Sequence, residues 1–190
     1  MKKYKIIALC GESGAGKDFT LNEVIRWDRE YCFTPRFHKI THTTTRPPRD
    51  NEINGHSYYF LSLSEYRAKR KESWPIVEVE YKDKWYYSVF KQDLMFDKIN
   101  IGVFSPAMIE LLRTDPRVEV IVVKIAAADK TRLRRQLDRS KNPDVEEIIR
   151  RFEADKVDFA NLKVDYTLNN EDVDYIINCR YIEEIGRKFF

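Results

Sequence analysis

Short apolar runs of strand length alternate along this chain with longer segments in which apolar residues recur at helical spacing. After the first run, for example, Leu21, Val24 and Ile25 fall on one face of a helix. The run 118–125 is the strongest, and its lack of alternation is typical of a strand buried on both faces. This order predicts an α/β fold with a parallel central sheet covered by helices. The runs that predict strands of this sheet are 5–10, 36–40, 100–104, 118–125 and 166–168.

Residues 41–89 interrupt the alternation. Residues 41–61 are polar and rich in turn-forming types, and the apolar runs 76–81 and 85–89 flank a short polar turn, which predicts a β-hairpin. We therefore expect 41–89 to form a small mixed insertion in one domain. The core of that domain is expected to comprise 1–40, 90–138 and 161–190.

A second change follows the helix predicted at 130–137. Residues 139–143 break this helix, and Asp144 begins another that extends to about 160. Ile148, Ile149 and Phe152 lie on one side of it.

Composition limits the classes of protein to consider. The chain has 190 residues, of which 43% are hydrophobic and 34% charged, as expected for a soluble globular domain. Lysine and arginine total 34 against 31 acidic residues, and the two signs are interspersed, so we do not expect a nucleic-acid-binding surface. No apolar run approaches the ~20 residues of a membrane span, and the first residues lead straight into a strand, so we expect neither a membrane segment nor a signal peptide. The three cysteines lack metal-ligand spacing and are expected to be reduced thiols of a cytoplasmic protein.

One stretch between the first strand and the first helix carries a chemical signal. It is Gly11-Glu12-Ser13-Gly14-Ala15-Gly16-Lys17-Asp18, a G-x-x-x-x-G-K motif. In this context the motif predicts a phosphate-binding loop, because its glycines let backbone N–H groups turn toward phosphate oxygens. The helix that begins near Lys17 adds its positive dipole end, and the Lys17 ammonium is expected to reach the β- and γ-phosphates of ATP. An ordinary glycine-rich turn is the alternative.

The residue after the lysine departs from the motif. Serine or threonine usually stands there and binds Mg²⁺ through its hydroxyl. This chain has Asp18, whose carboxylate is also a hard oxygen ligand suited to Mg²⁺. We therefore expect Asp18 to hold the metal directly or through water, with altered geometry.

The insertion resembles the guanylate kinase family closely. That family carries T-T-R-x-P-R-x-x-E-x-x-G-x-x-Y-x-F after the second strand, and residues 44–60 match this pattern in order. The resemblance covers nearly the whole chain and weakens between 90 and 117. It implies a P-loop three-layer α/β sandwich with a mixed monophosphate-binding insertion and a helical lid at about 139–160.

The resemblance also assigns roles to residues of the insertion. Arg46 and Arg49 are expected to bind the phosphate of a nucleoside monophosphate through their forked donors, and Glu52 to orient them. Tyr58 and Tyr87 align with the family's phosphate-binding tyrosines. Glu78 aligns with the carboxylate that accepts hydrogen bonds from guanine. A solvated loop is the alternative for the arginines, and a polar strand face for Glu78.

In the lid, the resemblance points to two catalytic arginines. Arg139 and Arg151 are expected to close on the triphosphate, with Lys17 as the third catalytic residue, and to neutralise charge on the transferring group. Arg135 and Arg150 are neighbours that could substitute.

Several positions depart from the family pattern. His42 stands where the family has a serine, and Ser88 and Val89 replace a glycine and a hydroxyl residue. The family's acidic L-D-x-D pattern is absent from 100–106. The Gly-Lys-Asp ending of the loop resembles phage-type deoxynucleoside monophosphate kinases and ribose bisphosphate kinases.

Together these features predict a nucleoside monophosphate kinase that uses ATP and Mg²⁺ and phosphorylates GMP or dGMP. The expected partners are small nucleotides, with no nucleic acid or membrane, and the protein is expected to be a monomer or homodimer. A broader deoxynucleoside monophosphate kinase, a ribose bisphosphate kinase and a non-catalytic guanylate kinase-like binding module are the alternatives. A GTPase is weaker, because no N-K-x-D motif is found.

Overall fold

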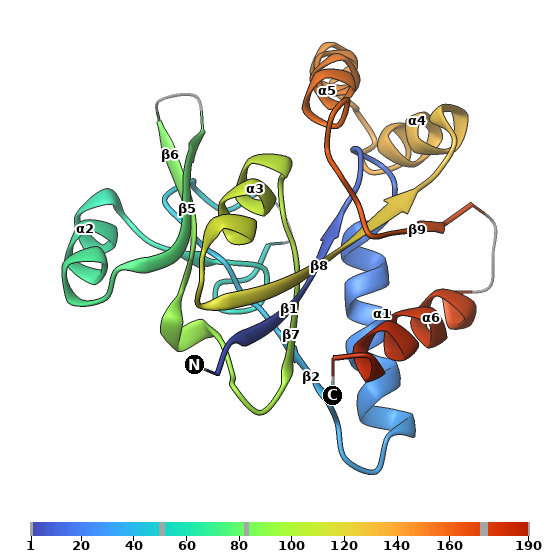
Figure 1. The fold of residues 1–190 in the computed structure, drawn as a ribbon. Helices are drawn as coiled ribbons and strands as arrows, with labels where there is room; N and C mark the ends of the chain where they lie inside the picture. Colours follow the sequence, from blue (N-terminus) through green and yellow to red (C-terminus); the bar gives the residue numbers. More distant parts are fainter. Residues whose placement is uncertain (1, 50–51, 82–83, 172–174, 190) are drawn as a thin grey trace.

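A computed structural model describes residues 2–49, 52–81, 84–171 and 175–189. The strands predicted above for the central sheet, the hairpin of the insertion, the helix after the first strand and the two helices around the break at 139–143 are all present (Figure 1). The strands are β1 (Tyr4–Cys10), β2 (Phe37–Lys39), β3 (Thr43–Thr44), β4 (Tyr59–Phe60), β5 (Pro75–Tyr81), β6 (Trp85–Phe90), β7 (Ile99–Val103), β8 (Val118–Ala126) and β9 (Tyr166–Asn169). The helices are α1 (Lys17–Tyr31), α2 (Leu63–Glu72), η1 (Lys91–Asp93), α3 (Pro106–Thr114), α4 (Asp129–Leu137), α5 (Val145–Asp158) and α6 (Tyr175–Arg187).

The central sheet has five parallel strands in the order β2-β7-β1-β8-β9. Side chains of β1 alternate between two apolar layers: Ile7 and Leu9 pack with α1 and α6, whereas Ile6 and Ala8 pack with α3 and the base of the β5–β6 hairpin. Helices therefore cover both faces of the sheet, as Figure 1 shows. This arrangement confirms the predicted α/β fold with a parallel central sheet.

A second, mixed sheet is built from the insertion. Its order is β4-β3-β6-β5, with β3 parallel to β4 and antiparallel to β6. β5 and β6 form the predicted hairpin, and residues 82–83 of its turn lie outside the described residues. Helix α2 packs on one side of this sheet through Tyr66, which stacks on Tyr86 with ring centroids 5.1 Å apart.

Helix α5 does not cover the central sheet (Figure 1). Asp144 caps its N-terminus by accepting from the Glu147 N–H at 3.0 Å, as expected for an N-cap residue. Ile148 is buried, but Ile149 on the predicted apolar side is 53% exposed. The helix stands beside the loop after β1 rather than over the sheet, so only part of its apolar face finds a partner (Figure 1).

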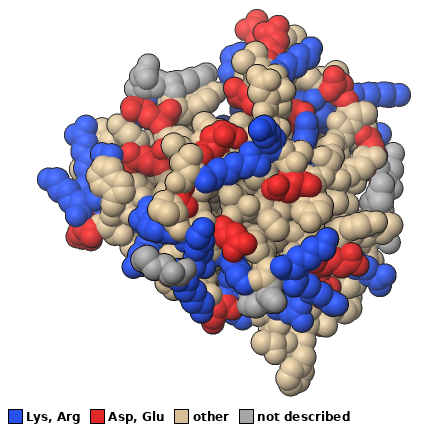
Figure 2. All heavy atoms as spheres, viewed as in Figure 1, with Lys and Arg blue, Asp and Glu red and all other residues tan. Residues whose placement is uncertain are grey.

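Charged side chains of both signs share the surface. Figure 2 shows Lys and Arg interspersed with Asp and Glu on the face drawn, rather than segregated from them. None of the helices in the described parts of the chain is long and apolar enough to cross a bilayer.

Candidate functional site

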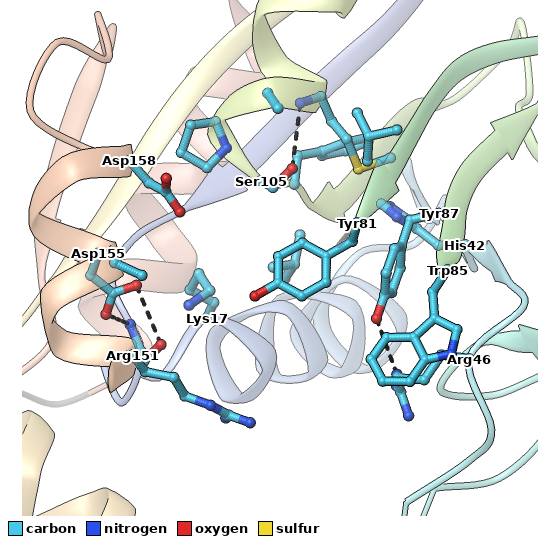
Figure 3. A pocket seen from close by; sticks show the side chains of 18 of the residues that line it. Lys17, His42, Arg46, Tyr81, Trp85, Tyr87, Ser105, Arg151, Asp155 and Asp158 are labelled. Atoms are coloured by element: carbon cyan, nitrogen blue, oxygen red, sulfur yellow. Dashed lines mark hydrogen bonds between the residues drawn. The ribbon is translucent and has the colours of Figure 1, made fainter. Parts of the chain in front are cut away.

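A cavity of about 860 Å³ opens at the carboxyl end of the central sheet, between the loop after β1 and the β5–β6 hairpin. Figure 3 shows Lys17 between α5 on one side and the aromatic side chains of the hairpin on the other. Ligand sites of open parallel sheets occur at this edge, where the strands deliver their loops. The predicted site residues among its lining are Gly11, Ser13, Lys17, Arg46, Arg49, Tyr58, Tyr87 and Arg151.

The loop between β1 and α1 is held by close backbone approaches. Gly11 and Gly14 have φ angles of 144° and 83°, which disfavour residues with a side chain. A β-carbon at Gly11 would overlap the carbonyl oxygen of Ile125 in β8, and one at Gly14 would overlap that of Arg132 in α4. The loop conformation thus depends on glycine at both positions.

Lys17 is the first residue of α1, so its position relative to the loop is fixed by the helix. Its Nζ donates to the carbonyl oxygen of Glu12 at 3.0 Å. Burial lowers the pKa of the Lys17 ammonium, and the carboxylates of Asp18 and Asp155 oppose this effect. Asp18 lies in the first turn of α1 with an exposed side chain. It is not among the described residues that line the cavity.

Asp155 of α5 binds the loop directly, which sequence reasoning missed. Its Oδ2 accepts from the Ser13 N–H at 2.7 Å, and its Oδ1 accepts from the Ser13 hydroxyl at 3.3 Å (Figure 3). The Arg132 guanidinium donates to the same Oδ2 at 2.8 Å and, through Nε, to the Ser13 carbonyl at 3.0 Å. A carboxylate therefore occupies donors of a loop predicted to bind phosphate.

On the opposite wall, Arg46 is buried and almost fully engaged. Its Nη1 and Nη2 donate to the two oxygens of Glu52 at 2.8 and 2.9 Å, its Nη1 also donates to the Pro47 carbonyl at 2.7 Å, and its Nε donates to the Tyr87 hydroxyl at 3.2 Å. A guanidinium has five N–H groups. Four of these N–H groups donate to the described residues named above, and the fifth, on Nη2, has no partner among the described residues. Arg46 thus offers a charge and one donor rather than an open fork.

Arg49 and Tyr58 complete this cluster. The Arg49 side chain is exposed and lines the cavity, while its backbone N–H donates to Glu52 at 2.7 Å. The Glu52 carboxylate therefore binds the guanidinium of Arg46 and the backbone N–H of Arg49, and so positions both residues. Burial raises the pKa of Tyr58 to about 12, so its hydroxyl stays protonated and can donate to an anion.

The structure does not bring Glu78 to the cavity. Its carboxylate accepts from the Tyr66 hydroxyl and lies 3.0 Å from Nη2 of Arg70, both on α2. The strand register explains this placement. Val79 pairs with Tyr87, and both line the cavity. Successive side chains of a strand point to opposite faces, so Glu78 points away from the cavity.

The region beside the cluster of Arg46, Arg49 and Tyr58 is aromatic. His42 is buried and lines the cavity, with its ring centroid 4.7 Å from that of Phe104. Its Nε2 has no hydrogen-bond partner among the described residues. Burial lowers the pKa of His42 to about 4, so the imidazole is neutral at neutral pH. Val89 is buried in the apolar layer below and is not among the described lining residues.

The arginines predicted to act in a lid are divided between two places. Arg151 lines the cavity and donates through Nε to Glu147 at 2.8 Å, and Arg150 donates twice to the same carboxylate at 2.6 and 2.8 Å. These bonds lower the pKa of Glu147 to about 2. Arg139 is exposed between α4 and α5 and is not among the described lining residues, although its charge contributes to lowering the pKa of Lys17.

The missed residues Asp155 and Arg132 lie in different helices, 23 positions apart. No local pattern connects two such residues, so sequence spacing could not have found the pair. Arg135, considered as a substitute catalytic arginine, instead donates to the carbonyls of Asn170 and Glu171, each at 2.8 Å.

Comparison with known proteins identifies relatives of the chain. The family model described as guanylate kinase matches residues 3–184. A guanylate kinase of Porphyromonas gingivalis is 40% identical over 92 residues, which are 47% of this chain and 45% of that protein. A guanylate kinase of Clostridium tetani is 38% identical over 73 residues, which are 38% of this chain and 32% of that protein. These matches thus span less than half of either relative's length.

Two further comparisons cover most of the chain. A guanylate kinase of Rhodopirellula baltica is 24% identical over 178 residues, 90% of this chain and 82% of that protein. The crystal structure of guanylate kinase from Anaplasma phagocytophilum superposes with a TM-score of 0.65 over 99% of this chain and 87% of that one. At 16% sequence identity, this structural match supports the fold alone.

His42 predicts a measurable pH dependence of stability. The unfolded chain takes up a proton on this imidazole near pH 6.5, whereas the folded protein does so only at about pH 4. The unfolded state therefore binds more protons in this interval. We expect His42 to lower the free energy of unfolding by about 3 kcal/mol between pH 7 and pH 4. Urea titrations across this range should show a shallower pH dependence in His42→Gln. The exposed His56→Gln is the control, and equal slopes in both variants would contradict the expectation.

Glu78→Gln should destabilise the protein by about 1–2 kcal/mol, because the variant loses charged hydrogen bonds to α2. Glu80→Gln, two residues along the same strand and exposed, should be nearly neutral. Thermal unfolding of both variants provides the comparison. Equal stability of the two would show that the contacts of Glu78 with α2 contribute little.

Proposed function

The chain belongs to the guanylate kinase family, and from this premise we propose that it transfers the γ-phosphate of ATP to GMP or dGMP, giving the nucleoside diphosphate and ADP. The observation that carries the proposal is a cavity that has cationic side chains at both of its ends. Gly11, Ser13 and Lys17 lie at one end, and the arginine–tyrosine cluster that includes Arg46 and Arg49 lies at the other. Two phosphate groups bound at these ends would face each other, as phosphoryl transfer requires.

In this proposal the loop 11–18 and the N-terminus of α1 bind the triphosphate, and Lys17 holds its terminal phosphates. Arg49, the remaining donor of Arg46, and the hydroxyls of Tyr58 and Tyr87 bind the acceptor phosphate. No general base is needed, because catalysis of this reaction depends mainly on positioning and charge neutralisation. The insertion 41–89 would then hold the acceptor and the segment 139–160 would act as the lid.

The lid supplies further positive charge. Arg151 already faces the cavity and, with Arg139, would neutralise charge on the transferring group. Both would have to turn toward the phosphates, Arg151 by leaving Glu147. The closed lid would keep water from ATP.

The residues at the loop fit a magnesium ion carried by ATP. Mg²⁺ at nucleotide sites usually needs only one or two protein carboxylates besides phosphates and water. Asp18, exposed in the first turn of α1, offers one and would hold the ion. When bound, Mg²⁺ would neutralise charge on the β- and γ-phosphates. Small nucleotides are the partners of such an enzyme, which we propose acts in the cytoplasm as a monomer or homodimer.

One observation favours a second candidate, a kinase of broader deoxynucleoside monophosphate specificity. Glu78 is engaged on α2, and His42 and Val89 stand where hydroxyl groups are expected. A site that forms matched hydrogen bonds with its substrate discriminates strongly, and the loss of such bonds weakens the discrimination. Membership of the family still favours guanine, but the state of these three positions leads us to expect a weaker preference for it.

A coupled assay over the ribo- and deoxynucleoside monophosphates tests the function. GMP or dGMP should be the best acceptor, with a preference well below the ~10⁴-fold of a fully hydrogen-bonded site. Glu78→Gln should leave that preference unchanged, because the carboxylate faces α2. Lys17→Ala, expected to fold normally and to be inactive, provides the blank.

Other outcomes of this assay would identify the alternatives. A best acceptor among dTMP and dCMP would favour the broader kinase, and turnover of ribose 1,5-bisphosphate would favour a ribose bisphosphate kinase. Nucleotide binding without any turnover would indicate a binding module.

The two arginines of the acceptor cluster should differ when replaced. Arg49→Ala should weaken monophosphate binding about ten- to a hundredfold and leave ATP binding and stability unchanged, because its side chain is exposed and faces the cavity. Arg46→Ala should also lower the melting temperature, because it leaves the half-buried Glu52 without its guanidinium partner. Calorimetric titrations of both nucleotides measure this, with the exposed Arg67→Ala of α2 as control. Equal losses for ATP and monophosphate would argue against a separate acceptor site.

A further inference from the structure

Three donors converge on the Asp155 carboxylate: the Ser13 N–H, the Ser13 hydroxyl and Nη2 of Arg132, at 2.7, 3.3 and 2.8 Å. Two of them belong to the loop that lines the cavity. Backbone N–H groups of such a loop are the ones that bind phosphate oxygens. This set of donors is therefore suited to an oxyanion, whether a tetrahedral phosphate or a planar carboxylate. In this structure the Asp155 carboxylate accepts all three hydrogen bonds.

The remaining contacts of Arg132 keep this set in place. Arg132 is buried, its Nε donates to the Ser13 carbonyl at 3.0 Å, and its Nη1 donates to Asp129 at 2.7 Å. Its guanidinium also stacks on Phe152, 4.4 Å from the ring centroid. The bonds to Ser13 and Asp129 involve neither Asp155 nor any other residue of α5, whereas Phe152 belongs to α5 and would move with it. Arg132 and Ser13 would thus keep their positions if the carboxylate moved away.

We propose that Ser13 and Arg132 form a subsite for the terminal phosphate of ATP, and that Asp155 occupies this subsite in the nucleotide-free protein. The inference rests on the proposed function for the identity of the nucleotide, but the subsite itself is defined by its donors. An incoming phosphate group takes over the three hydrogen bonds with its oxygens and displaces the carboxylate, since two anions cannot share these donors without strong repulsion.

The displacement is coupled to the lid. Asp155 and Arg151 are four residues apart on α5, so they lie one above the other on the same face of the helix. A movement of α5 that withdraws Asp155 from the loop also changes the position of Arg151 relative to the cavity. Occupation of the subsite is therefore linked to the placement of a lid arginine.

Asp155→Asn is the test, because it removes the competing charge while keeping shape and one acceptor oxygen. ATP and inorganic tripolyphosphate should bind about tenfold more tightly to this variant in calorimetric titrations, and Asp155→Ala should show the same direction. AMP, which lacks the terminal phosphates, should bind equally to variant and wild type. Asp158→Asn is the matched control, since Asp158 lies on α5 and lines the cavity but forms no hydrogen bond or ion pair with the described residues of the loop. Its effect, from the general loss of negative charge, should stay below about threefold.

The outcomes separate this inference from the kinase assignment. Unchanged or weaker binding of ATP and tripolyphosphate to Asp155→Asn and Asp155→Ala, both folded by circular dichroism, would overturn the subsite while leaving the kinase proposal intact. Tighter tripolyphosphate binding without phosphorylation of any acceptor would support the subsite and remove the kinase proposal. Absence of any anion binding to the wild type would overturn both.

Discussion

The site depends on the close approach of three segments of the chain to the loop after β1. Gly11 lies against the carbonyl of Ile125 and Gly14 against that of Arg132, so the end of β8 and the helix α4 shape the loop. Asn170, just after β9, donates to the Ala15 carbonyl at 2.8 Å and adds a third contact. All three segments are placed by the central sheet, because the carboxyl ends of parallel strands meet at one edge. The loop geometry is therefore a property of the whole sheet and not of the motif alone.

Charge pairing governs the rest of the cavity. Arg46 is paired with Glu52, Arg150 and Arg151 share Glu147, and Arg132 holds Asp155. Such pairs keep guanidinium groups ordered and offset the cost of bringing positive charges together. They also mean that binding an anionic ligand is an exchange of partners. Arg49 differs from these arginines, because its side chain is exposed where it lines the cavity.

Much of the fold could be predicted from the chain, because its signals are local. Apolar runs such as 118–125 and the N-cap residues Ser105 and Asp144 act within a few residues of the elements that they define. The exposed Ile149 marks the limit of this reasoning. Periodicity correctly indicated a helix at α5, but it could not show that the helix would stand beside a loop instead of covering the sheet.

The candidate site also combines features that local sequence signals predict with features that depend on tertiary contacts. The sequence by itself determined the loop 11–18, the order of residues in the insertion and the family, because these depend on residue types at fixed spacing along the chain. Only the tertiary structure decided that most donors of Arg46 are already used, that Asp155 occupies the loop, and that Glu78 lies on the far side of the hairpin. These three facts depend on strand register and on contacts between side chains far apart in the sequence. Spacing along the chain contains neither, because a one-residue change of register moves a side chain to the opposite face of a sheet.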